Sequence, residues 1–318
     1  MTPVDPQARA LLERWAATPG VPVERLTATA VRQDDLMVLD LQGDPDRLHA
    51  VDDIEVPGPA GAMAARVYRP GPGQLQTVLY LHGGGFVIGP EGYDAPLRRL
   101  ARSSGCLIVA LRCRLAPEHR FPAALEDALA GARWLAGDVR ALGGLDVPVG
   151  LAGDSSGGNL AAVVARSLTQ EAIPLAFQVL LYPMLDATAS SPSYDEFASG
   201  YGFSREKSLW YFDQYLPPEV DRRAPRVSPL FERHLSGLPP TLIVTAECDP
   251  LRDEGELYAR SLREAGVEVE LRRYPGMIHG FFQMIAALRS ARQLHEELAQ
   301  WLTNRSRTLG RDSGRPAG

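Results

Sequence analysis

The stretch from Val149 to Leu160 constrains this chain most, because it reads as a short apolar strand, a tight turn and the start of a helix. The turn is centred on Ser155, and Gly153 and Gly157 complete the pattern G-x-S-x-G. Small flanking residues let neighbouring backbone pass close to a strained turn. The pattern predicts a hydroxyl held at the carboxyl edge of a sheet. Glycine and serine also form ordinary loops, so the rest of the chain must decide between a nucleophile and a simple connection.

Apolar stretches of strand length alternate with helical stretches over most of the chain. An antiparallel hairpin is expected over 51–68. The later strands are expected at 77–81, 106–111, 147–152, 176–182, 241–246 and 267–274. The helices between and after them are expected at 94–101, 121–142, 156–168, 253–265 and 289–303. This alternation predicts an α/β fold with a mostly parallel central sheet covered by helices on both faces.

Two segments do not fit the alternation, and we expect them to form a helical cap that lines a substrate pocket. One is 1–45, with helices after Asp5 and over 23–41. The other is 186–226, an insertion between core strands, and insertions of this length are usually functional. The alternative is that its aromatic residues simply pack on the core. They are Tyr194, Phe197, Tyr201, Phe203, Trp210, Tyr211, Phe212 and Tyr215.

These segments divide the chain into predicted units. The N-terminal cap helices occupy 1–45, and the first part of the core occupies 46–185. The cap insertion follows at 186–226, and the second part of the core occupies 227–303. The tail over 304–318 is rich in Arg, Gly, Ser and Pro, and we expect it to be disordered.

Composition excludes several classes of protein. The net charge is −6 and no basic stripe is present, so we expect no nucleic-acid partner. No run of about 18 apolar residues occurs, so we expect no membrane span. The amino terminus lacks the apolar core of a signal peptide, which favours a cytoplasmic location. Cys106 and Cys113 lie too far apart along one predicted strand to form a disulfide, and we expect reduced thiols.

A serine nucleophile needs a base, and a histidine base needs an acid that orients it and stabilises its charge. His279 follows the predicted strand 267–274, and Asp249 follows the strand 241–246. Both therefore belong at the sheet edge that carries Ser155. Asp253 and Glu254 are rival acids, but they begin a predicted helix, where carboxylates commonly cap. We therefore favour Asp249.

Such a nucleophile also needs fixed N–H donors for the negative charge that develops on the substrate oxygen. The run His82-Gly83-Gly84-Gly85-Phe86 follows a core strand, and its glycines leave backbone N–H groups accessible. Gly84 and Gly85, together with the N–H of Ser156, would supply three donors. Glycine-rich phosphate loops and dinucleotide motifs are excluded, because their Lys-Ser/Thr pair and their glycine spacing are absent.

Taken together, these motifs resemble those of the hormone-sensitive-lipase-like family of carboxylesterases, which has the α/β-hydrolase fold. The resemblance extends over about 51–302. The matching segments are His82-Gly83-Gly84-Gly85-Phe86, Arg114-Leu115-Ala116-Pro117-Glu118-His119, Phe121-Pro122-Ala123, Gly153-Asp154-Ser155-Ser156-Gly157-Gly158-Asn159-Leu160, Leu181-Tyr182-Pro183, Asp249-Pro250-Leu251-Arg252-Asp253-Glu254-Gly255 and His279-Gly280-Phe281.

The resemblance implies Ser155 as nucleophile, His279 as base and Asp249 as acid, with the three N–H donors named above and a helical cap. The predicted function is a serine carboxylesterase, a carboxylic ester hydrolase that cleaves short- to medium-chain acyl esters of small molecules through an acyl-enzyme. It needs no metal and no organic cofactor. The alternatives are hydrolysis of an amide, lactone or carbamate by the same machinery, and a receptor that binds ligand without catalysis. The resemblance also suggests a homodimer through the strand 267–274.

Two positions depart from the usual pattern of that family. The residue after the nucleophile is usually Ala and here is Ser156, whose backbone N–H is unchanged, so we expect a small effect. An Asp-Tyr pair usually stands where this chain has Arg112-Cys113. We expect that exchange to alter packing and pocket shape behind the glycine run and to leave the triad intact.

Overall fold

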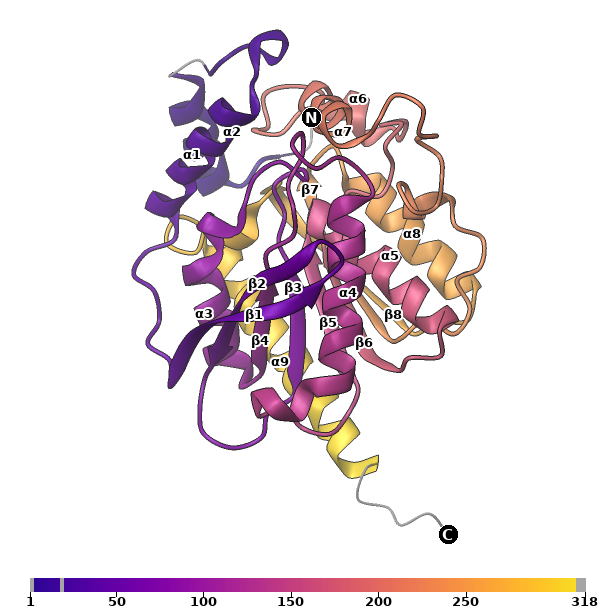
Figure 1. Ribbon diagram of the computed structural model, residues 1–318. Helices are drawn as coiled ribbons and strands as arrows, with labels where there is room; N and C mark the ends of the chain where they lie inside the picture. Colours follow the sequence, from indigo (N-terminus) through magenta and orange to yellow (C-terminus); the bar gives the residue numbers. More distant parts are fainter. Residues whose placement is uncertain (1–2, 18–19, 313–318) are drawn as a thin grey trace.

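An eight-stranded sheet forms the centre of the computed structural model, which describes residues 3–17 and 20–312 (Figure 1). The strand order is β1-β2-β4-β3-β5-β6-β7-β8. The predicted hairpin is antiparallel, β2 is antiparallel to β4, and all other neighbours are parallel, which confirms the mostly parallel sheet. The strands are β1 (Ala50–Gly58), β2 (Gly61–Arg69), β3 (Thr77–Leu81), β4 (Leu107–Leu111), β5 (Val149–Asp154), β6 (Leu175–Leu181), β7 (Thr241–Cys248) and β8 (Val269–Ile278).

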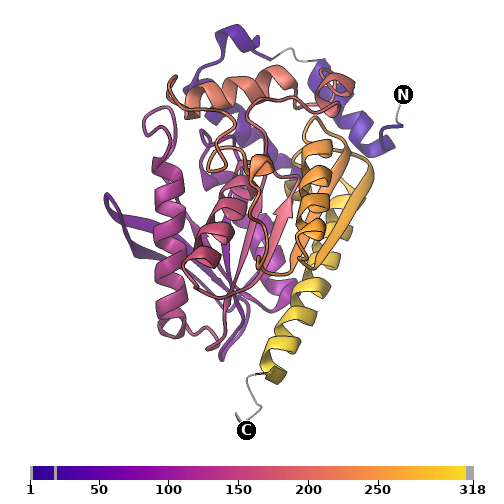
Figure 2. The same ribbon diagram turned by 90° about the vertical axis from the view of Figure 1, so that its right-hand side faces the viewer.

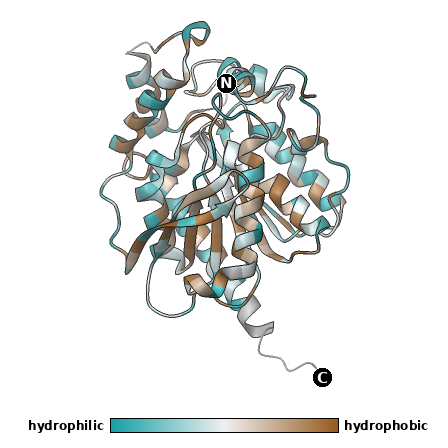
Figure 3. Cartoon of the chain, viewed as in Figure 1, coloured by the Kyte–Doolittle hydropathy of each residue, from teal (hydrophilic) through white to brown (hydrophobic). Residues whose placement is uncertain are grey.

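Helices cover both faces of this sheet (Figure 2). Strand side chains alternate between two cores: Leu79 and Leu81 pack with α4, α5 and α8, whereas Val78 and Tyr80 pack with α3 and α9. All four are at most 1% exposed, and Figure 3 shows the hydrophobic colour gathered on the central strands. The covering helices are α3 (Asp94–Ser104), α4 (Ala123–Asp138), α5 (Ser156–Gln170), α8 (Arg252–Glu264) and α9 (Arg289–Asp312).

The N-terminal segment begins with α1 (Pro6–Ala16), where the Asp5 carboxylate accepts hydrogen bonds from the N–H groups of the first turn, as predicted. The single helix expected over 23–41 was wrong. Thr27 caps a new helix by accepting from the N–H of Ala30, so the segment divides into three short pieces. They are a 3₁₀ turn (Val23–Arg25), α2 (Ala28–Asp35) and a second 3₁₀ stretch (Leu36–Leu41).

The insertion contributes two further helices, α6 (Ser193–Glu196) and α7 (Arg205–Tyr215). In both views the helices α2 and α7 lie at the same end of the molecule (Figures 1 and 2). Residues from both line one cavity with Ser155, which directly follows β5. The exact division into cap and core stays a prediction. The remaining short 3₁₀ pieces are Pro90–Tyr93, Val139–Leu142, Pro229–Phe231 and Phe281–Gln283.

The expectation of a disordered tail from residue 304 was wrong for 304–312, because α9 continues to Asp312. A tertiary contact supports this extension, because the Arg305 guanidinium pairs with the Glu268 carboxylate outside the helix. Within the helix, the same guanidinium lies 5.0 Å from the centre of the Trp301 ring. The Ser306 hydroxyl also donates to the carbonyl of Leu302. The rest of the predicted tail, 313–318, lies outside the described residues.

Candidate active site

Ser155 stands in a strained turn directly after β5, with φ 51° and ψ −120°. Its N–H donates to the carbonyl of Leu181 at 2.9 Å, which ties the turn to β6. A side chain at Gly157 would overlap the carbonyl oxygen of Leu81, and one at Gly153 would overlap backbone of the following helix. The glycines on both sides of Ser155 are therefore required by close backbone approach, as the pattern predicted.

Three predicted side chains meet beside this turn. The hydroxyl of Ser155 lies 3.0 Å from Nε2 of His279, and Nδ1 of His279 lies 2.8 Å from Oδ2 of Asp249. A carboxylate only accepts, so Nδ1 donates to Asp249 and Nε2 is left to accept from the serine hydroxyl. Asp249 is fully buried, and its other oxygen accepts from the N–H of Leu251 at 2.9 Å. This arrangement is a relay from acid to base to hydroxyl.

The rival acids lie elsewhere. Asp253 accepts from the N–H of Ser193 at 2.9 Å and pairs with Arg252. Glu254 is buried and accepts from the N–H of Leu185 at 2.5 Å. Neither bonds to His279, so the structure brings together the acid that the sequence favoured.

Aromatic rings enclose the imidazole of His279. Phe203, from the insertion, stacks on it with ring centres 4.6 Å apart and planes 24° apart. Tyr182, after β6, meets it edge-on at 4.9 Å. Aromatic contact on two sides limits the orientations that the imidazole can adopt, so the insertion helps to hold the ring toward Ser155.

The glycine run after β3 turns beside Ser155. Gly84 and Gly85 have φ values of +105° and +59°, which glycine adopts without strain. Within the described chain no hydrogen bond uses the N–H groups of Gly84, Gly85 or Ser156. The predicted donors are thus adjacent to the hydroxyl in the fold, and their N–H groups remain available to a substrate.

A buried network that sequence reasoning missed holds the start of this run. Asp154 accepts from the N–H of Gly83 and from the hydroxyl of Tyr80, both at 2.9 Å, and from the hydroxyl of Tyr93 at 2.8 Å. Burial raises the pKa of Asp154 to about 6, although these hydrogen bonds oppose the shift. Asp154 stands within the serine motif, but its partners come from β3 and from the residues after the glycine run. Only the fold could identify them.

Both departures from the family pattern make contacts of their own. The Ser156 hydroxyl accepts a hydrogen bond from the N–H of Phe86 at 3.2 Å and so joins the serine turn to the glycine run. The Arg112 guanidinium lies 3.0 Å from the Glu91 carboxylate, and both side chains are about half exposed. Cys113 is buried, which raises the pKa of its thiol.

Ser155 opens into a cavity of about 170 Å³. Its walls come from the glycine run, from both segments that interrupt the alternation, and from the stretch after β8. The N-terminal segment contributes Asp35 and Val38, and the insertion contributes Phe203 and Tyr211. Within 3–17 and 20–312, no group of three or more His, Cys, Asp or Glu residues is arranged to hold a metal ion. Over the same residues, no helix is both long and apolar enough to cross a membrane.

The fold and this geometry define a class of protein, and comparison with known proteins agrees. Residues 78–283 match the family model described as the alpha/beta hydrolase fold, so the chain belongs to the α/β-hydrolase family. This confirms the fold that the sequence motifs implied.

Named relatives narrow the class. This chain is 42% identical to the carboxylic ester hydrolase LipN of Mycobacterium tuberculosis. The match covers 74% of this chain and 65% of LipN. The chain is 37% identical to the ethyl acetate hydrolase of Pseudomonas putida, over 79% of this chain and 81% of that protein. A solved hyperthermophilic esterase from Pyrobaculum calidifontis superposes with a TM-score of 0.90 at 40% identity, covering 95% of this chain and 98% of the other.

Proposed function

We propose that this protein is a serine carboxylesterase in which Ser155 is the nucleophile, His279 the base and Asp249 the acid. The observation that carries the proposal is the hydrogen-bonded relay from Asp249 through His279 to Ser155, which ends at the cavity. The similarity to proteins named carboxylic ester hydrolase, ethyl acetate hydrolase and esterase supports the same reaction.

In the first half of the reaction the Ser155 oxygen attacks the ester carbonyl carbon while its proton passes to Nε2 of His279. The carbonyl oxygen becomes negative, and the N–H groups of Gly84, Gly85 and Ser156 stabilise it. His279 then protonates the leaving alcohol as the carbon–oxygen bond breaks, which leaves an acyl group on Ser155. Asp249 stabilises the positive imidazolium in between.

In the second half a water molecule repeats the attack. It gives its proton to His279, its oxygen bonds to the acyl carbon, and His279 returns the proton to the Ser155 oxygen as the carboxylic acid leaves. Each residue thus returns to its starting state. No metal or organic cofactor enters any step.

The size of the cavity supports short to medium acyl chains. With a volume of about 170 Å³, the cavity beside Ser155 is about a fifth of the size of the neighbouring cavity of about 790 Å³. An acyl chain held entirely within this cavity is therefore short to medium.

The test is Ser155→Ala with a chromogenic acetyl ester as substrate. We expect hydrolysis to fall to the uncatalysed rate while circular dichroism stays unchanged, and a fluorophosphonate probe to label only the unaltered protein. Turnover retained by a folded Ser155→Ala variant would refute the assignment. A panel of esters, amides, lactones and carbamates with varied acyl length then defines selectivity.

Two further proposals concern the setting of this activity. We propose that the protein acts in the cytoplasm, which its three free cysteines, all buried, favour. A homodimer through β8 is supported only by family resemblance and by the position of β8 at the edge of the sheet. The mass of the protein in solution, measured by light scattering, decides whether the dimer forms.

A further inference from the structure

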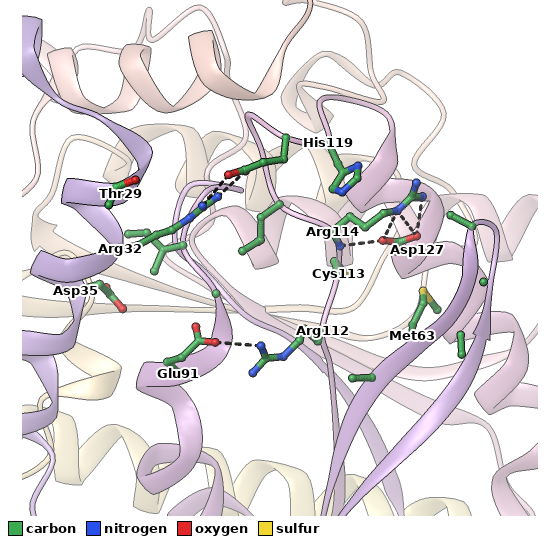
Figure 4. Close-up of a pocket in the computed structure, with 18 of the residues that line it drawn as sticks. Thr29, Arg32, Asp35, Met63, Glu91, Arg112, Cys113, Arg114, His119 and Asp127 are labelled. Carbon is green, nitrogen blue, oxygen red and sulfur yellow. Dashed lines mark hydrogen bonds and ion pairs between the residues drawn. The ribbon is translucent and has the colours of Figure 1, made fainter.

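A second, larger cavity adjoins the one that holds Ser155. Its volume is about 790 Å³, and it lies among α2, the turn of the β1–β2 hairpin and the segment 112–119 (Figure 4). Asp35 and Ile88 line both cavities, so they stand where the two meet. A substrate held at Ser155 whose far end extends past these two residues would enter the larger space.

The larger cavity is lined by ionic groups, and all its arginines are paired. Figure 4 shows these pairs as dashed lines, while the Asp35 carboxylate lies apart from them. Nothing in the described chain donates a hydrogen bond to Asp35 or forms an ion pair with it. Four carboxylates therefore face three guanidinium groups, and the unmatched charge is at the junction of the cavities. The three pairs are Arg32–Glu118 at 2.7 Å, Arg112–Glu91 at 3.0 Å and Arg114–Asp127 at 2.8 Å.

The surroundings of Asp35 make its negative charge costly. The carboxylate is partly buried, and the groups around it are negative or neutral: Asp154 at the end of β5, Glu91 and Tyr93 after the glycine run, and Tyr211 on α7. Burial, followed by Asp154 and Glu91, raises the pKa of Asp35 to about 6. At neutral pH the Asp35 carboxylate is mostly ionised. A cation beside it would offset both its repulsion by the neighbouring carboxylates and the hydration that it loses on burial.

We propose that Asp35 is a specificity-determining residue that selects esters with a positively charged group, such as a substituted ammonium, remote from the ester bond. An alkyl group in this position would cover the carboxylate without pairing it, which is unfavourable. An anionic group would be repelled. The inference rests on the proposed esterase function and adds the substrate class.

Pairs of esters that differ only in charge test this directly. Acetylcholine and 3,3-dimethylbutyl acetate have the same shape, with a positive nitrogen in one and a neutral carbon in the other. Ethyl 4-(trimethylammonio)butanoate and ethyl 5,5-dimethylhexanoate form the matching pair with the charge at the acyl end. For each pair we measure the kcat/KM of the cationic ester and divide it by the kcat/KM of the neutral ester.

For at least one pair we expect the ratio to fall about tenfold in Asp35→Asn, as for loss of a partly screened ion pair. The kcat/KM of the neutral ester should rise rather than fall, because covering the amide of Asn costs less than covering an ionised carboxylate. Asp34→Asn is the matched control, because Asp34 is the exposed neighbour on the same helix and lines neither cavity. In the unaltered protein the ratio should also fall as the pH drops from 8 to 5, since Asp35 becomes neutral. In Asp35→Asn the fall should be clearly smaller, and what remains of it is attributed to Asp154, whose pKa is also about 6.

Two results would overturn the proposal: ratios that Asp35→Asn leaves unchanged for both pairs, or an equal change in Asp34→Asn. A failure of the esterase assignment is distinguishable, because neither member of either pair would then be hydrolysed. In that case, binding of the same esters to Ser155→Ala, measured by calorimetry, decides the role of Asp35. If Ser155→Ala binds the cationic ester more tightly than the neutral one, and the added Asp35→Asn change abolishes that preference, the role of Asp35 is supported. If Ser155→Ala binds both esters of a pair equally, the role is rejected.

Discussion

Replacing Ser156 by alanine removes one hydrogen bond between the serine turn and the glycine run. The Ser156 hydroxyl accepts from the N–H of Phe86 at 3.2 Å, and the two residues are 1% and 4% exposed. Phe86 has φ 65°, which is uncommon for a residue other than glycine, so its backbone depends on its surroundings. Its ring stacks on Tyr215 with centres 3.8 Å apart.

The structure sets the size of the effect. In Ser156→Ala the buried N–H of Phe86 loses its partner, which costs about 1–3 kcal/mol of unfolding free energy. The N–H of residue 156 itself remains. Gly85, the neighbour of Phe86, shifts with the loosened run, so we expect kcat to fall about two- to tenfold, much less than the 100-fold or more for a lost oxyanion donor. KM should change little.

Urea unfolding and steady-state hydrolysis of a short acyl ester measure the two effects. Ser104→Ala is the matched control, because the hydroxyl of Ser104 is also buried and also accepts a backbone N–H, that of Cys106, at 3.2 Å. It lies at the end of α3, away from the cavity. We expect similar destabilisation there and no change in kcat. Equal kcat losses in both variants would refute the positioning role. Unchanged kcat in Ser156→Ala would also refute it, and would uphold the small effect expected from the sequence.

Two further substitutions test the glycine run and its support. In Gly85→Ala the new Cβ would overlap the Tyr211 ring, so kcat/KM should fall about 100-fold or more. Gly237→Ala is the control: φ is +78°, and its Cβ would make only an ordinary contact with the Thr169 methyl at 3.7 Å, so kcat/KM should stay unchanged. Because the pKa of Asp154 is raised from 3.8 to about 6, its stabilising contribution is complete below pH 4 and is lost as the pH rises through 6. The unfolding free energy of the unaltered protein minus that of Asp154→Asn should therefore decrease by about 2 kcal/mol between pH 4 and 7. A constant difference in urea titrations would contradict this.

Much of the site could be predicted because it depends on strand ends. Ser155, Asp249 and His279 each come directly after a parallel strand, and the carboxyl ends of parallel strands share one edge of the sheet. The structure places Asp249, and not Asp253, beside His279, although Asp253 does not cap the helix that it begins, as the sequence suggested, and instead accepts from the N–H of Ser193. The single helix over 23–41 was wrong because apolar spacing alone did not show that Thr27 starts a new helix.

The amino-acid sequence by itself determined the layered fold and the three relay residues, since apolar period and motif spacing are properties of neighbours along the chain. The tertiary structure alone decided which other distant groups meet. It placed Phe203 on the imidazole of His279, extended α9 through the contact of Arg305 with Glu268, and left Asp35 without a partner among the described residues. Such pairings depend on distances between elements that fold together from far apart in the chain, and no local pattern records them.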